Sequence, residues 1–341
     1  MSPHRDDGDA GDESIRVGIF SVAHLHANTY ATQLDSLGGA SFVGVADTGE
    51  SRVQEFAASH GVDAYDPETL FETVDAAIVC LTNTEHRTWA ERAADAGVHV
   101  LSEKPLAPGV SDARAIVDAC DAADVHLGVA MPLRFSLPAR KAKEALEAGE
   151  VGTLQSVAGT NRGQMPGGWF VDPAASGGGA VMDHSVHIVD LVHWLTGERV
   201  TNVYAEMDTH FHDVPVEDVN LLSMMLTDGT QFSLDGSWSR PETWDFWGDA
   251  TVSLVGTDAT VEVDCFGQKL KHTDSSEDGD GIASIYWGSN PNGGLVEDFV
   301  DAVREDRPPE TTGEEGLEAV AVVEAAYESA ERGESVDVDY R

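Results

Sequence analysis

Residues 15–26 read IRVGIFSVAHLH, an apolar run that gives way at Ser21 to a turn of small and polar residues. A short apolar run bounded by turn residues is typical of a strand buried on both faces. The same pattern recurs as far as about residue 130, with helical stretches between the apolar runs. Further strands are expected at 41–46, 75–81, 98–102 and 125–130, and helices at 29–37, 50–60, 85–96 and 110–122. This alternation predicts a doubly wound parallel sheet of the Rossmann type.

The pattern changes after residue 130, where strand-like segments follow one another with few helices between them. Strands are expected at 154–160, 200–207, 220–226, 230–237, 250–255 and 260–264, and helices at 137–148, 179–195 and 314–331. Turn residues such as Thr227-Asp228-Gly229 separate the later strands and favour hairpins. We therefore expect a mostly antiparallel open sheet with covering helices. The expected organisation is a disordered acidic tail (1–14), a Rossmann-like dinucleotide-binding domain (15–130) and an α+β substrate and oligomerisation domain (131–341), with a mobile acidic loop at 274–280.

The chain is strongly acidic, with 61 Asp and Glu against 20 Lys and Arg and a formal net charge of -41. This balance excludes nucleic acids and anionic membranes as partners, since both require clustered basic residues. Because molar salt shortens the Debye length to about 3 Å, such a surface is typical of a halophile's protein. The three cysteines, Cys80, Cys120 and Cys265, are too far apart for a disulfide framework or a zinc cluster. No signal peptide or membrane span is visible, so we expect a cytoplasmic protein.

The turn after the first strand lacks all three glycines of the G-x-G-x-x-G dinucleotide fingerprint. Ser21 and Ala23 are nevertheless small, so the backbone there could still approach a phosphate at the start of the next helix. Asp47 ends the second strand, where an acidic residue would bind a ribose 2′-hydroxyl. Alternatively, Asp47 is a helix cap or a solvated turn residue. No arginine directly follows Asp47, which favours NAD over NADP.

Two further segments carry groups suited to acid–base chemistry. Lys104, in Ser102-Glu103-Lys104-Pro105, follows a predicted parallel strand, at the edge of the sheet where ligands bind. Asp183 and His187 are four residues apart in SGGGAVMDHSVHIVD (176–190), so on a helix they would share one face. A carboxylate beside an imidazole suits a general base. The alternatives are a surface Lys–Glu pair and a structural Asp–His pair.

Together these segments resemble the Gfo/Idh/MocA oxidoreductases, the family of glucose–fructose oxidoreductase and inositol dehydrogenase. The resemblance covers residues 15–335. Its motifs are Thr82-Asn83-Thr84-Glu85-His86, Glu103-Lys104-Pro105, Arg134-Phe135 and the Gly177–Asp190 run. It implies an NAD-dependent dehydrogenase, with NADP possible, acting on a secondary hydroxyl of a sugar or polyol. By resemblance, His187 would take the hydroxyl proton, Asp183 would orient His187, and Lys104 would bond the reacting oxygen.

The resemblance also implies the surrounding site and an assembly. The cofactor-binding set would be Ser21, Ala23, His24, His26, Asp47, Thr82, Asn83, His86, Glu103 and Lys104, with no metal. The substrate side would be Asn161, Arg162, Trp169 and His184. Trp238, Trp244 and Trp247 are expected in the core or at an interface. The open sheet would form a homodimer or homotetramer.

Two other functions remain open on the sequence. His24 and His26 form an H-x-H after the first strand, as in barrel-type metal-dependent hydrolases, and Asp183, His184 and His187 could complete a metal site. The antiparallel-looking second half argues against a barrel. A Rossmann binding protein that has lost catalysis is the other alternative.

Overall fold

The computed structural model describes residues 14–341 apart from 48, 275–280 and 287. The expected acidic tail, except for Ser14, and the acidic loop after Asp274 therefore lie outside the described residues. The side chains of 50, 51 and 269–286 are not described either.

The first half of the chain forms a six-stranded sheet in the order β3-β2-β1-β4-β5-β6, in which every pair is parallel. Its strands are β1 (Ile15–Phe20), β2 (Ala40–Ala46), β3 (Asp63–Tyr65), β4 (Ala76–Val79), β5 (His99–Ser102) and β6 (Leu127–Val129). The helices between them are α1 (Ala27–Ser36), α2 (Glu50–His60), α3 (Pro67–Phe71), α4 (His86–Asp95) and α5 (Val110–Ala122). The strand order reverses between β1 and β4, and ligands of such sheets bind at this point beyond the carboxyl ends. The predicted Rossmann-like sheet is confirmed.

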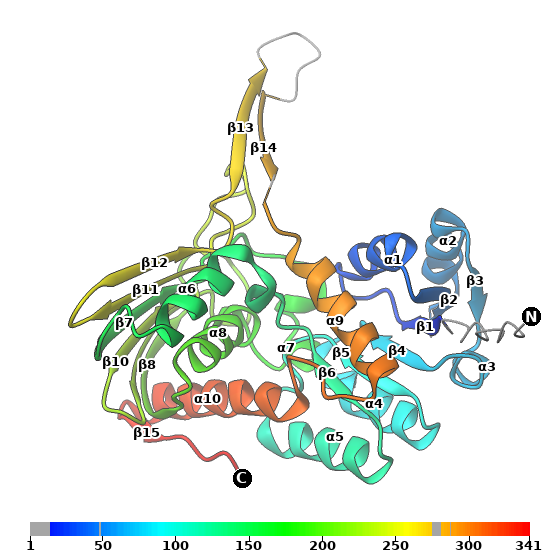
Figure 1. The fold of residues 1–341 in the computed structure, drawn as a ribbon, viewed down its shortest axis with the longest axis horizontal. Coiled ribbons are helices and arrows are strands. Elements are labelled where there is room, and N and C mark those ends of the chain that lie inside the picture. Colours follow the sequence, from blue (N-terminus) through cyan, green and yellow to red (C-terminus); the bar gives the residue numbers. More distant parts are fainter. Residues whose placement is uncertain (1–13, 48, 275–280, 287) are drawn as a thin grey trace, which may run out of the picture.

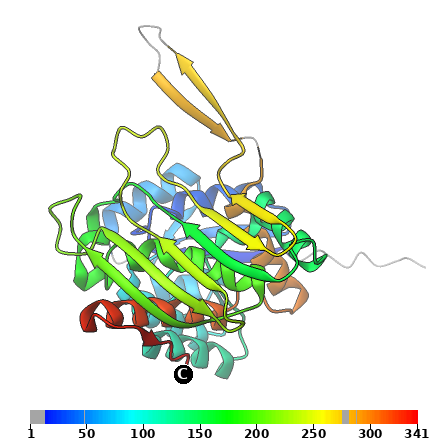
Figure 2. The same cartoon turned by 90° about the vertical axis from the view of Figure 1, so that its left-hand side faces the viewer.

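The second sheet has the order β12-β11-β7-β10-β9-β8-β15, and only its β7–β10 pair is parallel. Its strands are β7 (Leu154–Thr160), β8 (Val200–Asp208), β9 (Val219–Leu226), β10 (Gln231–Asp235), β11 (Thr251–Gly256), β12 (Thr260–Asp264) and β15 (Val336–Asp337). Helices α6 (Leu137–Glu147), α8 (Val186–Thr196) and α10 (Gly313–Arg332) cover one face (Figure 1), and Figure 2 shows the other face without helices. The expected open, mostly antiparallel sheet is confirmed. Strands β13 (Lys269–Asp274) and β14 (Gly281–Tyr286) pair with each other and project from this body.

Helix α9 (Pro291–Glu305), which the sequence did not predict, returns from the second half of the chain to the first sheet (Figure 1). Its Leu295 and Phe299 are buried in one cluster with Val17, Ile19 and Tyr30 of β1 and α1. The helix begins with Pro291-Asn292-Gly293-Gly294. Because glycine disfavours helix interiors, this glycine pair weakens the helical signal in the sequence. The Asn290 side chain caps the first turn by accepting from Gly293 N at 3.1 Å.

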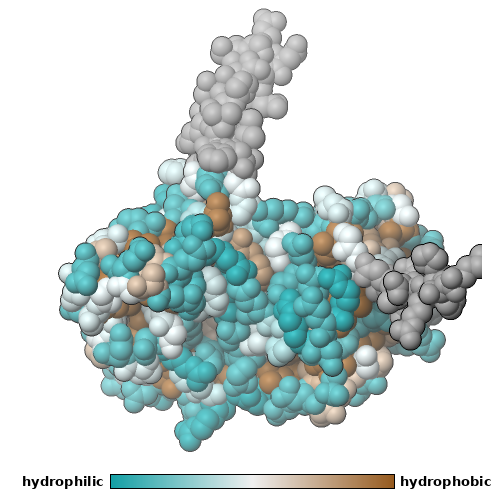
Figure 3. Space-filling model, in the orientation of Figure 1, coloured by the Kyte–Doolittle hydropathy of each residue, from teal (hydrophilic) through white to brown (hydrophobic). Residues whose placement is uncertain are grey.

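The surface agrees with the acidic composition, since hydrophilic side chains cover most of the face seen in Figure 3. None of the described helices combines the length and apolar character that crossing a membrane requires. All three cysteines are free and buried.

Candidate active site

Lys104 and Asp183, from opposite halves of the chain, meet beyond the carboxyl end of β5. Lys104 follows β5 directly, and Asp183 lies in η4 (Val181–Ser185), a π-helical turn that leads into α8. The Lys104 ammonium group pairs with the Asp183 carboxylate and also donates to the Asp183 carbonyl oxygen at 3.2 Å. Both residues are buried. The structure therefore joins two of the three expected catalytic residues across the two sheets.

The Asp183 carboxylate has two further partners. Trp238 Nε1 donates to its Oδ2 at 3.1 Å, and His184 Nε2 lies 3.3 Å from the same oxygen. Burial alone would raise the pKa of Asp183, but the charge and hydrogen bond of Lys104, together with His184 and His187, outweigh burial and lower the pKa. Asp183 is therefore an ionised carboxylate held in place by three side chains. Trp238 lies in the core as expected, but its role as a partner of Asp183 was not predicted.

His187, at the start of α8, is partly exposed, and its Nδ1 atom is buried without a hydrogen-bond partner. Burial lowers the pKa of His187 well below its ordinary value, and the charge of Lys104 lowers it further. The imidazole is thus neutral at neutral pH and able to accept a proton. No hydrogen bond joins it to Asp183, although both residues are fully described. Asp183 lies in a π-helical turn, which is wider than an α-helical turn, so the four-residue spacing does not have its usual α-helical geometry here.

The three glycines before η4 make room for other parts of the protein. A Cβ atom on Gly178 would lie 2.0 Å from the Tyr327 hydroxyl, and one on Gly179 would lie 2.1 Å from the Glu217 carbonyl oxygen. The Glu217 carboxylate accepts from Gly179 N and from Val181 N, each at 3.0 Å, and from the Tyr327 hydroxyl at 2.8 Å. Glu217 and Tyr327, neither of which was predicted, therefore fix the start of the turn that leads into α8.

The turn after β1 is held by Asp47 and by the second half of the chain. Ser21 has a φ of 69°, the left-handed region that glycine normally occupies. The Asp47 carboxylate accepts from the Ser21 hydroxyl at 3.1 Å and from Val22 N at 3.0 Å. Trp169 Nε1 donates to the Ala23 carbonyl oxygen at 3.0 Å. Ser21 thus keeps the glycine-like turn, and Trp169, expected on the substrate side, lies over it.

Glu103 is the centre of a buried polar cluster beside Lys104. Its Oε1 atom lies 2.8 Å from His26 Nδ1 and 3.3 Å from His24 Nδ1, and it accepts from the Tyr30 hydroxyl at 2.6 Å. Burial lowers the pKa of His24 to about 3, so this ring is neutral. Burial would raise the pKa of Glu103, but its neighbours His24 and His26 lower it well below the ordinary value.

The other expected cofactor residues lie in the segment that connects β4 to α4 and at the start of α4. The Thr82 hydroxyl donates to Glu85 at 2.7 Å, and Asn83 Nδ2 donates to the Ser176 carbonyl oxygen at 2.8 Å, which ties this segment to the segment before the glycines. His86 is fully buried, and its Nδ1 donates to the Pro105 carbonyl oxygen at 2.9 Å. The structure therefore places His86 beneath the Lys104 loop rather than at the surface of the site.

Of the expected substrate residues, His184 contacts Asp183, whereas Asn161 and Arg162 contact Asp249. Asn161 Nδ2 donates to the Asp249 carbonyl oxygen at 2.6 Å, and Arg162 pairs with the Asp249 carboxylate at 2.9 Å. The His184 ring lies 6.0 Å from the ring of Trp247. Trp244 and Trp247 are 45% and 41% exposed, so of the two expected places, core or interface, the core is wrong for them.

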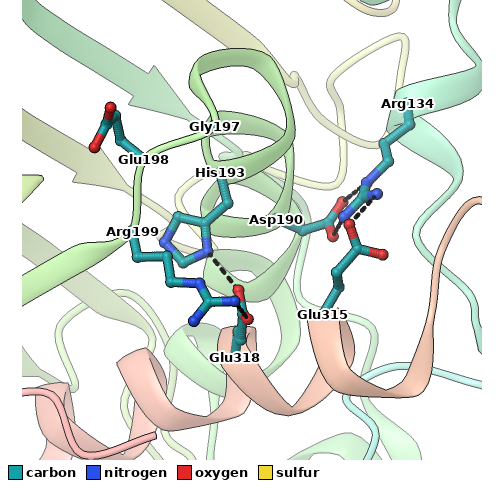
Figure 4. Close-up of a pocket in the computed structure, with 8 residues that line it drawn as sticks. All are labelled: Arg134, Asp190, His193, Gly197, Glu198, Arg199, Glu315 and Glu318. Carbon is teal, nitrogen blue, oxygen red and sulfur yellow. Dashed lines mark hydrogen bonds and ion pairs between the residues drawn. The ribbon is translucent and has the colours of Figure 1, made fainter. Parts of the chain in front are cut away.

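A polar cavity of about 200 Å³ lies between α8 and α10, apart from the Lys104–Asp183 pair (Figure 4). Arg134, which follows Pro132 and Leu133 in η2 (Pro132–Phe135), pairs there with Asp190 and with Glu315 at 2.8 Å. Arg199 pairs with Glu318 in the same cavity. Since each arginine has a carboxylate partner, this cluster fastens α8 to α10 and explains the Arg134 motif without a role in the reaction.

Comparison with known proteins agrees with this architecture. Residues 15–131 match the model of an oxidoreductase family with an NAD-binding Rossmann fold, and residues 139–262 match the GFO/IDH/MocA C-terminal domain. The chain is 26% identical to myo-inositol 2-dehydrogenase of Thermotoga maritima, over 95% of this chain and 99% of that protein. It is 29% identical to D-xylose 1-dehydrogenase (NADP(+)) 2 of Haloferax volcanii, over 86% and 91%.

Among solved structures, the chain is similar to GenD2 from gentamicin A biosynthesis in complex with NAD. The TM-score is 0.87 at 26% identity, over 96% of this chain and 97% of that one. Both halves of the fold and their order along the chain thus agree with one family. The chain belongs to the GFO/IDH/MocA oxidoreductases.

Proposed function

We propose that this protein is an NAD-dependent dehydrogenase that oxidises a secondary hydroxyl of a sugar, a polyol or a related compound. The observation that carries the proposal is the cluster of Lys104, Asp183 and His187. It combines an ammonium group, an ionised carboxylate and a neutral imidazole beyond the carboxyl end of β5. Oxidation of an alcohol needs a base for the hydroxyl proton and a donor for the oxygen, and this cluster supplies both.

His187 takes the hydroxyl proton, since burial keeps its imidazole neutral. Lys104 donates a hydrogen bond to the reacting oxygen and stabilises negative charge that develops there. Asp183 holds Lys104 in position and acts on His187 through the electrostatic field rather than through a hydrogen bond. The nicotinamide, when bound, accepts the hydride.

The described residues fit a dinucleotide at the end of β1. The N-terminus of α1 has no side-chain cap, which leaves backbone N–H groups available to a pyrophosphate. Asp47 ends β2, where it would accept from a ribose hydroxyl and repel a 2′-phosphate. Arg52 Nη2 lies 3.4 Å from Asp47 Oδ2 and was not predicted. An arginine there could pair with a 2′-phosphate, so Asp47 and Arg52 act in opposite directions on the choice between NAD and NADP.

The experiment that tests this function is a turnover assay followed by nicotinamide absorbance. Relatives that act on myo-inositol, D-xylose and D-apiose define the panel, and each compound is tested with NAD+ and NADP+ in high salt. Turnover that disappears in His187→Ala supports the proposal. If neither dinucleotide binds, the hydride-transfer function is wrong.

The same proposal includes a homo-oligomer in the cytoplasm of a halophile. The open face of the second sheet exposes Tyr204, Leu221 and Val255, which suits an interface between copies of the chain. The excess of acidic residues supports a high-salt environment. Analytical ultracentrifugation of the wild type and of Leu221→Lys in molar KCl tests the interface. A monomer in the wild type would contradict it.

A further inference from the structure

The turn after β1 and the end of β5 bring two histidines and a glutamate together in the interior. His24 Nδ1 and His26 Nδ1 lie 3.3 and 2.8 Å from the same Glu103 oxygen, and the three ligand atoms all lie within 4.8 Å of one another. The side chains of His24 and Glu103 are 1% and 0% exposed. We propose that His24, His26 and Glu103 form a binding site for a zinc-class divalent ion. This site does not depend on the proposed dehydrogenase function.

The spacing of these atoms fits tetrahedral coordination. Zinc binds imidazole nitrogen and carboxylate oxygen at roughly 2.0–2.2 Å, so two ligands at the tetrahedral angle lie about 3.3 Å apart. The distance from His24 to Glu103 has this value, and the distance from His26 to Glu103 requires a small outward movement of His26. His26 can make it, because its side chain is 25% exposed.

The surroundings hold the ligands as metal sites require. The Tyr30 hydroxyl and the Lys104 N–H group each donate to the Glu103 carboxylate, at 2.6 and 3.0 Å, which fixes its orientation. The rings of Trp169 and Phe170 lie 5.9 and 5.4 Å from the His24 ring and pack against it. Neighbouring protein thus fixes both the carboxylate and the more buried imidazole.

The donor set determines the class of ion. Two imidazole nitrogens and one carboxylate suit zinc or cobalt, whereas magnesium and calcium prefer oxygen ligands alone. The site differs from the one considered for a hydrolase, because Asp183 is occupied by Lys104 and Trp238 and is not needed here. An ion bound to these residues would connect the turn after β1, which lacks the usual glycines, to the end of β5.

The test is titration of the full chain, freed of metal with a chelator, with cobalt(II) in molar KCl. We expect saturation at one equivalent, with the intense visible absorption of tetrahedral cobalt, and displacement by zinc. His26→Ala and Glu103→Gln should each lose this absorption. His126→Ala is the matched control, since His126 also lies beside a second histidine and a carboxylate but outside the cluster. It should bind cobalt as the wild type does.

A second measurement avoids any reliance on variants that fold poorly. Zinc at a few equivalents should raise the melting temperature of the wild type and of His126→Ala, because an ion that binds only the folded state stabilises it. It should leave folded His26→Ala unchanged. The proposal is overturned if the wild type takes up no cobalt at one equivalent, or if His26→Ala keeps the tetrahedral spectrum. Neither result bears on dinucleotide binding, which is measured separately.

Discussion

The ammonium group of Lys104 donates to both the backbone carbonyl and the carboxylate of Asp183. This contact joins the end of β5 to the turn before α8, so two of the expected catalytic residues, one from each half of the chain, share one buried ion pair. Breaking one side of such a pair leaves an uncompensated charge in the interior. The position of Lys104 therefore depends on Asp183, and the predictions below concern the groups around this pair.

Removal of the proposed base should abolish most turnover. His187→Ala should lower kcat by about 10²- to 10⁴-fold, the usual cost of losing a general base. The affinity for the dinucleotide, measured by nicotinamide fluorescence, should change little, because His187 lies in the other half of the chain. His210→Ala, at an exposed histidine, is the control. Near-normal turnover by His187→Ala would refute the catalytic assignment.

The pH dependence of oxidation should reflect the lowered pKa of His187. Its imidazole stays neutral, and so remains a base, below the ordinary value of about 6.5. The acid limb of the kcat/KM profile should therefore lie below pH 6.5. The positive charge of Lys104 lowers the pKa of His187. Lys104→Met removes this charge, so the acid limb of its residual activity should move to higher pH. Lys104→Arg keeps the charge, so its acid limb should stay where the wild type has it. An acid limb above pH 6.5 in the wild type would contradict this description.

Asp47 and Arg52 should determine the relative affinities for NAD(H) and NADP(H). NAD(H) should bind more tightly than NADP(H), since the Asp47 carboxylate repels a 2′-phosphate. Asp47→Ser should reduce or reverse the preference, because Arg52 would then face the phosphate without its carboxylate partner. Arg52→Ala should strengthen the preference for NAD(H). Separate titrations of NADH and NADPH measure both effects, and equal affinities in all three proteins would show that Asp47 does not lie at the ribose.

Gly179 should tolerate no side chain. A Cβ atom there would lie 2.1 Å from the Glu217 carbonyl oxygen, and a backbone atom cannot move aside as a flexible side chain would. Gly179→Ala should lower the free energy of unfolding by about 1–3 kcal/mol, as overpacking does, and should lower turnover by shifting η4. Gly38→Ala is the matched control, because a Cβ atom on Gly38 has no neighbour within 4 Å. Equal melting curves for the two variants would show that the backbone at Glu217 moves to accommodate a Cβ atom on residue 179.

Salt should stabilise the folded chain. At a net charge of -41, self-repulsion grows as salt falls, since the Debye length rises from about 3 Å at 1 M to about 10 Å at 0.1 M. The melting temperature should decrease as KCl is lowered below about 1 M. Sucrose, which does not screen charge, is the control. A melting temperature independent of KCl would argue against adaptation to high salt.

Much of the fold could be predicted from periodicity. Helices α2 and α5 have the predicted bounds, and so do β7 and β12. The short elements β3 and α3 were missed because three to five residues carry too little periodic signal. Helix α9 was missed for a different reason: its first turn contains two glycines, and its stability comes from packing against α1 and β1 rather than from intrinsic propensity.

The sequence predicted which residues belong to the candidate site, but it did not predict most of the contacts between them. Lys104 and Asp183 were found through local motifs, but their pairing depends on how the two halves of the chain meet. Glu217 and Tyr327 contact the start of η4 from distant segments, and neither is part of a motif. The expectation that Asp183 and His187 share one helix face assumed an α-helix, but Asp183 lies in a π-helical turn and no hydrogen bond joins the two described side chains.

Helix α9 has a consequence for the order in which the protein is made. Phe299 and Leu295 complete the hydrophobic cluster formed by β1 and α1, although they lie near the other end of the chain. A ribosome that has synthesised only the six parallel strands has therefore released a sheet whose α1 side is still incomplete. While only the first half of the chain exists, this cluster lacks Leu295 and Phe299. The apolar surface that they cover stays open to water until the second sheet has been translated and α9 has been synthesised.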